Sequence, residues 1–124
     1  KIYTKGKGAD AVYDPVGGEA FKAALRATAQ MGRILVVGFA SGDIPQIPAN
    51  ILLVKNISVI GYYWGAYQVL EPLILEKSFS ELFKWFNLGQ LNPQISQTFD
   101  LEDAPKAIEE LKKRKSIGKL VIKI

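Results

Sequence analysis

The residues of this chain that are best suited to contact a ligand lie at the ends of three predicted strands. These ends read Asp14-Pro15-Val16, Gly38-Phe39-Ala40-Ser41 and Tyr62-Tyr63-Trp64. In each, aliphatic residues give way to turn formers or aromatic residues, and a glycine such as Gly38 lets the backbone approach a flat ring. The N–H and C=O groups beyond a strand end can pair with an amide. The pattern favours a planar ligand with polar edges, while glycines that serve only as strand-exit turns explain it equally well.

Several kinds of site are excluded by residues that the chain lacks. It contains no cysteine and no histidine, which excludes disulfides, Cys/His zinc sites and nucleophile–histidine arrangements within its 124 residues. An all-carboxylate metal site is not excluded by composition, but no Asp/Glu cluster has metal-ligand spacing, so no metal site is predicted. No catalytic residue can be assigned within the chain. No G-x-G-x-x-G fingerprint opens a helix, and no acidic residue ends a second strand about 20 residues later. The chain alone therefore has no pyrophosphate cradle.

The composition is that of a soluble globular domain, with 48% hydrophobic and 23% charged residues. No apolar run reaches the roughly 18 residues that span a bilayer, and no signal peptide is visible. We therefore expect a cytoplasmic protein without membrane contact. The chain starts with Lys1 and its only methionine is Met31, so we expect Lys1 not to be a natural translation start.

The net charge of +4 is concentrated in the basic run Lys112–Lys115. Such a run can bind nucleic acid. It can also be a solvated helix C-terminus, where cations oppose the negative end of the macrodipole. The second interpretation is favoured, because no aromatic residues interleave the run to stack on bases. No nucleic-acid partner is predicted.

Hydrophobic periodicity predicts alternating strands and helices. Gly32 is expected to end the first helix, and Ser78 with Glu81 has the spacing of a capping box for the second. Gly61, inside the third strand, indicates a bulge or the close approach of another group. For residues 51–55 the sequence does not distinguish a short helix from an extended segment. The predicted strands cover residues 11–13, 34–37, 57–65, 94–99 and 119–124, and the predicted helices cover residues 19–31, 78–88 and 102–113.

This order predicts an α/β fold whose parallel sheet is only half of a doubly wound one. The run 34–37 is continuously apolar, as in a strand covered on both faces. Two helical stripes are expected in the core. They consist of Phe21 and Leu25, and of Phe79, Leu82, Phe83 and Phe86.

The chain resembles a known protein family in four stretches taken together. These are YDPVGG, LVVGFASG, KNISVIGYYWG and the tail FDLEDAPKAIEELKKRKSIGKLVIKI. The chain is similar to the C-terminal part of the quinone oxidoreductase-like branch of the zinc-type alcohol dehydrogenase, or medium-chain dehydrogenase/reductase, superfamily. The resemblance implies the C-terminal half of a nucleotide-binding Rossmann domain in residues 1–90. Residues 91–124 would close the GroES-like catalytic domain, whose remainder, like the glycine-rich loop, would precede Lys1.

The resemblance also implies a cofactor site for NADPH or NADH, without metal, since this branch typically lacks zinc. Asp14, Pro15 and Val16 would pack near the cofactor's ribose. The backbone of Tyr62, Tyr63 and Trp64 would face the carboxamide. The residues along the nicotinamide ribose and ring would be Val37, Gly38, Phe39, Ala40 and Ser41.

Two functions of different class follow. The first is a piece of an NAD(P)H-dependent oxidoreductase that transfers hydride to a quinone or an activated alkene or carbonyl, and that is inactive without the missing parts. The hydride chemistry would belong to the cofactor. The second is a non-catalytic α/β module that self-associates through exposed sheet edges. A zinc-type alcohol dehydrogenase or an enoyl reductase remains an alternative for the whole protein.

A homodimer is expected through the edge strand Asn56–Trp64. As the last strand of its half-sheet it has a row of unpaired N–H and C=O groups, and it lacks the inward charge or proline that usually protects an edge. Pairing with its own copy about a two-fold axis would satisfy both rows, and the resemblance points the same way. The alternative is that residues 69–77 of the same chain cover this edge.

Overall fold

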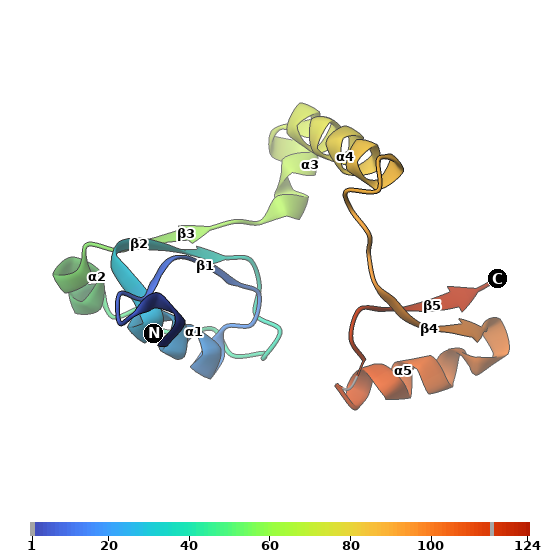
Figure 1. Cartoon of the computed structure of the whole chain (residues 1–124), viewed down its shortest axis with the longest axis horizontal. Coiled ribbons are helices and arrows are strands. Elements are labelled where there is room, and N and C mark those ends of the chain that lie inside the picture. The colour runs from blue at the N-terminus through green and yellow to red at the C-terminus, as the bar shows by residue number, and fades with distance from the viewer. Residues whose placement is uncertain (1, 115) are drawn as a thin grey trace. The chain divides into compact units, whose positions relative to one another are not determined.

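The computed structural model describes residues 2–114 and 116–124, so Lys1 and the Lys115 end of the basic run lie outside the described residues. The chain divides into two compact units, Lys1–Pro72 and Leu73–Ile124, which are described separately (Figure 1). The domain boundary predicted between residues 90 and 91 concerns a longer protein and stays a prediction.

The first unit is built on a parallel three-stranded sheet in the order β1-β2-β3 (Figure 1). This confirms the predicted βαβ arrangement and the parallel pairing. After the short turn η1 (Ile2–Thr4), its elements are β1 (Ala9–Asp14), α1 (Gly18–Ala27), β2 (Thr28–Val36), α2 (Ala49–Lys55), β3 (Ser58–Gly61), η2 (Trp64–Ala66) and α3 (Tyr67–Leu70).

The core of this unit lies between one face of the sheet and the helices α1 and α2. The register places Val12, Ile34 and Val59 side by side, and α1 packs Phe21 and Leu25 against this row. The predicted first stripe is therefore confirmed as core.

The opposite face of the same sheet carries the next row of side chains. This row consists of Tyr13, Leu35 and Ile60, of which Tyr13 is 66% and Ile60 44% exposed. The expectation that the strand at 34–37 is covered on both faces is wrong for the described residues, because helices pack on one face only.

The first helix ends earlier than its periodicity predicts. It stops at Ala27, and residues 28–32 open β2 instead of completing the helix. Thr28 takes an extended conformation, its hydroxyl donates to the Ala24 carbonyl oxygen at 2.7 Å, and its backbone pairs with Ala9. Sheet pairing therefore outweighs the helical pattern, and Gly32 lies in a strand rather than at C′.

The third strand is shorter than predicted. It ends at Gly61, and Trp64 begins the 3-10 turn η2. The pairing of Val36 with Gly61 continues the register without interruption, so the bulge considered at Gly61 is absent. Residues 51–55, left open by the sequence, are helical in α2.

In the second unit two parallel strands pair directly, and the helix α5 connects them and lies beside them (Figure 1). The predicted strand–helix–strand order is confirmed, and Pro105 lies in the first turn of α5 as expected. Lys112 ends this helix, which agrees with the helix-end interpretation of the basic run. The elements are β4 (Ile95–Asp100), η3 (Leu101–Asp103), α5 (Ala104–Lys112) and β5 (Lys119–Lys123).

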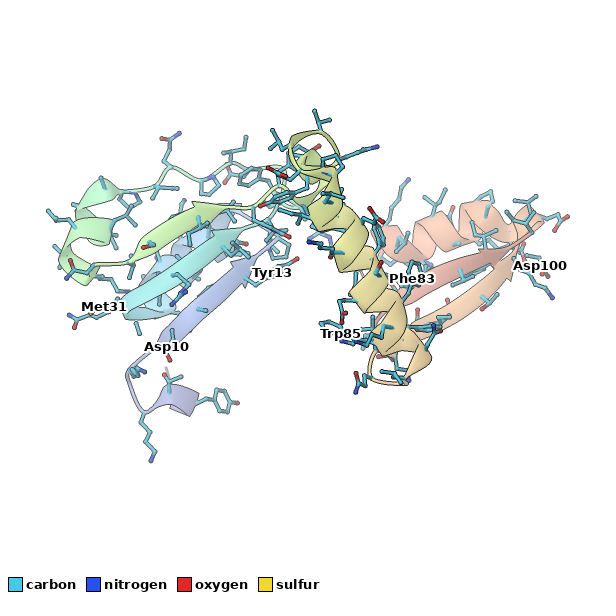
Figure 2. The ribbon with its side chains drawn as sticks, turned by 90° about the horizontal axis from the view of Figure 1, so that it is seen from above. Asp10, Tyr13, Met31, Phe83, Trp85 and Asp100 are labelled. Carbon is cyan, nitrogen blue, oxygen red and sulfur yellow. The ribbon has the colours of Figure 1, made fainter. Side chains whose placement is uncertain are left out.

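The long helix α4 (Pro72–Asn87) differs from its prediction in two ways. It begins six residues before Ser78, so the capping box is not its start, because Pro72 is a better first-turn residue. Its expected core stripe is not buried: Phe83 is 64% and Phe86 54% exposed, while Phe79 stacks on Phe83. In Figure 2, Phe83 and Trp85 point to different sides of this helix.

Candidate functional site

A cavity of about 520 Å³ opens at the carboxyl ends of β2 and β3. Ligands of open parallel sheets bind at this end of the strands. Figure 2 shows the direction of the sheet, with Asp10 near the start and Tyr13 near the end of β1. The cavity is lined by Val36, Val37, Gly38, Phe39, Gly61, Tyr62 and Tyr63.

Five predicted site residues, which come from two of the three predicted strand ends, line this one cavity. Sequence reasoning missed Val36 and Gly61 as lining residues, although Gly61 carried a signal as a glycine among β-branched residues. Trp64 does not line the cavity, because the strand ends three residues earlier and the chain turns into η2. The other predicted residues outside it are Asp14, Pro15, Val16, Ala40 and Ser41.

Hydrogen bonds that involve these residues and Val37 join the loops after β1 and β2. The N–H of Val37 donates to the Asp14 carbonyl oxygen at 2.9 Å, and that of Ala40 donates to the Pro15 carbonyl oxygen at 3.0 Å. Ser41 donates to the Val16 carbonyl oxygen from both its N–H, at 3.0 Å, and its hydroxyl, at 2.7 Å. The N–H groups of Ala40 and Ser41 are thus used within the protein.

Asp14 lies at the base of these joined loops. Its side chain is turned inward and the residue is 4% exposed. Oδ1 accepts hydrogen bonds from the N–H of Val16 at 2.9 Å and of Gly17 at 3.0 Å. Oδ2 is buried and has no hydrogen-bond partner within the described residues. In this conformation the carboxylate shapes the turn that leads to α1.

Three aromatic residues line the cavity, and two of them, Phe39 and Tyr62, pack against other residues of the first unit. The Tyr62 ring packs against Tyr67 of α3 with a centroid distance of 5.9 Å. The Phe39 ring lies against Gly17, where an added Cβ would approach Phe39 Cδ1 to 2.9 Å. Gly17 also has a φ of 73°, so this position requires glycine for conformation and for space.

Backbone groups at the cavity remain available for a ligand. Among the hydrogen bonds of the described residues, none is donated by the N–H of Phe39 or of Tyr63. The N–H of Tyr62 donates to the Val36 carbonyl oxygen at 2.8 Å. Because the wall is otherwise apolar, the cavity suits a flat ring with a few polar atoms at its edge.

No charged side chain lines the cavity. Within the first unit, a hydrogen bond in α1 from Lys22 to Glu19 lowers the pKa of Glu19 and raises the pKa of Lys22. Over residues 2–114 and 116–124 there is no group of three side chains able to hold a metal ion. In the same ranges no helix is long and apolar enough to cross a membrane.

The sequence of the chain is similar to that of a known protein family. The model of a family described as zinc-binding dehydrogenase matches residues 2–122. A quinone oxidoreductase-like protein 2 homolog of Nematostella vectensis is 47% identical over 123 residues, which is 98% of this chain and 34% of that protein. The chain therefore spans about a third of the length of this relative.

Solved structures of oxidoreductases also match this chain. A quinone oxidoreductase of Pseudomonas syringae matches with a TM-score of 0.80 and 30% identity, over 98% of this chain and 37% of that one. A mycobacterial protein complexed with NADPH matches with a TM-score of 0.81 and 26% identity, over 97% of this chain and 37% of that one. The half-sheet expected from the sequence is thus part of a dehydrogenase-type Rossmann fold.

Proposed function

Because the chain belongs to the zinc-binding dehydrogenase family, we propose that it supplies the nicotinamide side of the cofactor site in an NAD(P)H-dependent oxidoreductase. The observation that carries the proposal is the cavity at the ends of β2 and β3, with its glycines, aromatic walls and free N–H groups. The bound NADPH of the mycobacterial relative supports this choice of ligand.

The residues present fit a nicotinamide ring. Near Gly38 an added Cβ would have only the Pro15 carbonyl oxygen within 4 Å, at 3.5 Å, so this position leaves space for a ligand rather than for packing. The N–H groups of Phe39 and Tyr63 can donate to the carboxamide oxygen, and the Tyr62 carbonyl oxygen can accept from its amide. The joined loops keep these groups in place.

When bound, the reduced nicotinamide would supply a hydride to an acceptor. The part played by this chain is to bind and orient the ring and to shield one side of it with Phe39 and Tyr62. A quinone is the proposed acceptor, because the relative from Nematostella vectensis is named quinone oxidoreductase-like. An activated alkene or carbonyl has the same requirement for hydride addition at an electron-poor carbon.

The residues of this chain do not fit a zinc site, although the family description names the metal. It contains neither cysteine nor histidine, and zinc in proteins is held mainly by these side chains. We therefore assign no role to zinc here. Besides the phenols of Tyr62 and Tyr63, no side chain that could act as an acid, base or nucleophile lines the cavity, and the remaining groups for proton delivery are proposed to come from the remainder of a longer protein.

The edge of β3 is proposed to pair with a second copy. The N–H of Tyr62 donates inward to Val36. Because N–H groups alternate in direction along a strand, those of Val59 and Gly61 point outward. These outward groups supply the free hydrogen-bonding row that a two-fold related strand would need.

The proposal is tested by titrating the full-length protein with NADPH and with NADH and following the quenching of tryptophan fluorescence. Saturable binding that is lost on Gly38→Val supports the site. Absence of binding for both cofactors by the unchanged full-length protein would overturn it. The 124-residue chain serves as a comparison, and we expect it to show no reductase turnover.

A further inference from the structure

Gly61 ends β3 without any structural need for glycine. Its φ lies outside the left-handed region, and an added Cβ would find no atom within 4 Å. No bulge occurs there, since the pairing with Val36 continues the register of the strand. A glycine in a strand is unfavourable, because it loses more conformational freedom on folding and packs no side chain. Something other than the described fold must account for it.

Most other glycines of the chain, unlike Gly61, have a conformational or steric reason to be glycine. Nine of the eleven glycines have either a positive φ or a neighbouring atom within 3.2 Å of an added Cβ. Gly8, for example, has a φ of 96°, and its Cβ would lie 2.3 Å from the Ala27 carbonyl oxygen. The two glycines without such a reason are Gly38 and Gly61, and both line the same cavity.

The two glycines come from neighbouring strand ends. Gly38 follows β2 and Gly61 ends the adjacent strand β3, so both line the cavity at the carboxyl edge of the sheet. Directly after Gly61 come Tyr62 and Tyr63, which provide an aromatic wall and the free N–H of Tyr63. A ligand amide that paired with the N–H of Tyr63 would bind two residues along the chain from Gly61, which lines the same cavity.

We propose that Gly61 is a specificity-determining position which keeps the cavity open for the nicotinamide ring itself, as distinct from its ribose. This inference rests on the proposed function. The principal alternative is that glycine admits the backbone of a second copy at the β3 edge, because the N–H of Gly61 points outward.

The test uses the full-length protein with the variants Gly61→Val and Gly38→Val. Ser58→Val is the matched control, because it enlarges a side chain of the same strand that does not line the cavity. Each protein is titrated with whichever of NADPH and NADH binds more tightly. It is also titrated with the matching fragment that lacks the ring, 2′-phospho-ADP-ribose or ADP-ribose. Oligomeric state is measured in parallel by light scattering.

We expect Gly61→Val to weaken binding of the complete cofactor about tenfold or more, and to leave the ring-free fragment and the oligomeric state unchanged. Ser58→Val should change neither affinity. Equal weakening of both ligands, or a loss of dimer without a change in affinity, would overturn the inference. If the unchanged protein binds and Gly38→Val weakens binding while Gly61→Val does not, the proposed function stands and the inference fails. If the unchanged protein binds no cofactor, both fail.

Discussion

The hydroxyl of Ser41 donates a hydrogen bond of 2.7 Å to the carbonyl oxygen of Val16, and so joins the loop after β2 to the loop after β1. The same hydroxyl accepts from the N–H of Asp43 at 3.2 Å. One exposed serine therefore connects two loops that are distant in sequence and lie next to the candidate cavity. Its contribution can be measured separately from that of the cavity lining.

Ser41→Ala should lower the free energy of unfolding by about 0.5–1.5 kcal/mol, the usual net value of a hydrogen bond. Urea unfolding of the 124-residue chain, followed by circular dichroism, measures this difference. Ser58→Ala is the control, because Ser58 is exposed and should change stability by less than about 0.5 kcal/mol. Equal stabilities of the Ser41 variant and the unchanged chain would show that the joined loops do not depend on this side chain.

Asp14→Ala should be more damaging than Asp14→Asn. Alanine leaves the N–H groups of Val16 and Gly17 without their acceptor, at a cost of about 1–3 kcal/mol, whereas asparagine retains an oxygen in the place of Oδ1. The two variants are compared by thermal unfolding. If both lose the same stability, the negative charge rather than the acceptor geometry is what the turn requires.

Gly38→Val should weaken cofactor binding in the full-length protein while the fold is kept. The added Cβ meets only the Pro15 carbonyl oxygen, at an ordinary distance of 3.5 Å, so the branched side chain enters the cavity instead of the core. Overpacking of about 1–3 kcal/mol corresponds to roughly 5- to 150-fold in affinity. A normal dissociation constant in a folded variant would make Gly38 a strand-exit turn only.

Gly118→Ala should disrupt the second unit, whereas Gly89→Ala should not. Both glycines have a positive φ, of 94° and 69°, so both substitutions introduce backbone strain. At Gly118 the new Cβ would also lie 2.3 Å from the Gln94 carbonyl oxygen, while at Gly89 it would meet nothing within 4 Å. Heteronuclear NMR spectra should show β4 and β5 resonances displaced in the first variant alone.

Val59→Pro should break the proposed dimer, because it removes an outward-pointing N–H from the edge of β3. Val59 also packs against the core, so the monomer will lose some stability as well. Val59→Ala is the control, since it loses packing but keeps the N–H. Light scattering measures the oligomeric state of each protein, and an unmodified chain that is monomeric at tens of micromolar would refute the dimer.

Local patterns in the sequence were sufficient for the order of elements and for the parallel α/β class. Strand 94–99 and the helix that starts after Asp103 follow from periodicity and from Pro105 in a first turn, which are properties of neighbouring residues. The ends of elements depended on distant partners. Helix α1 stops at Ala27 because Thr28 pairs with Ala9, and no pattern within residues 19–31 contains that information.

The place to look for a ligand also follows from local patterns, because turn formers and aromatic residues come after three strands. Which of these residues line one cavity, and which join the loops, depends on how the chain folds. Ala40 and Ser41 use their N–H groups on Pro15 and Val16, whereas Gly61, which the sequence singles out only as a glycine within a strand, lines the cavity. The physical reason is that hydrogen bonds between loops, and the space beside a glycine, depend on residues that are brought together by the sheet and are far apart along the chain.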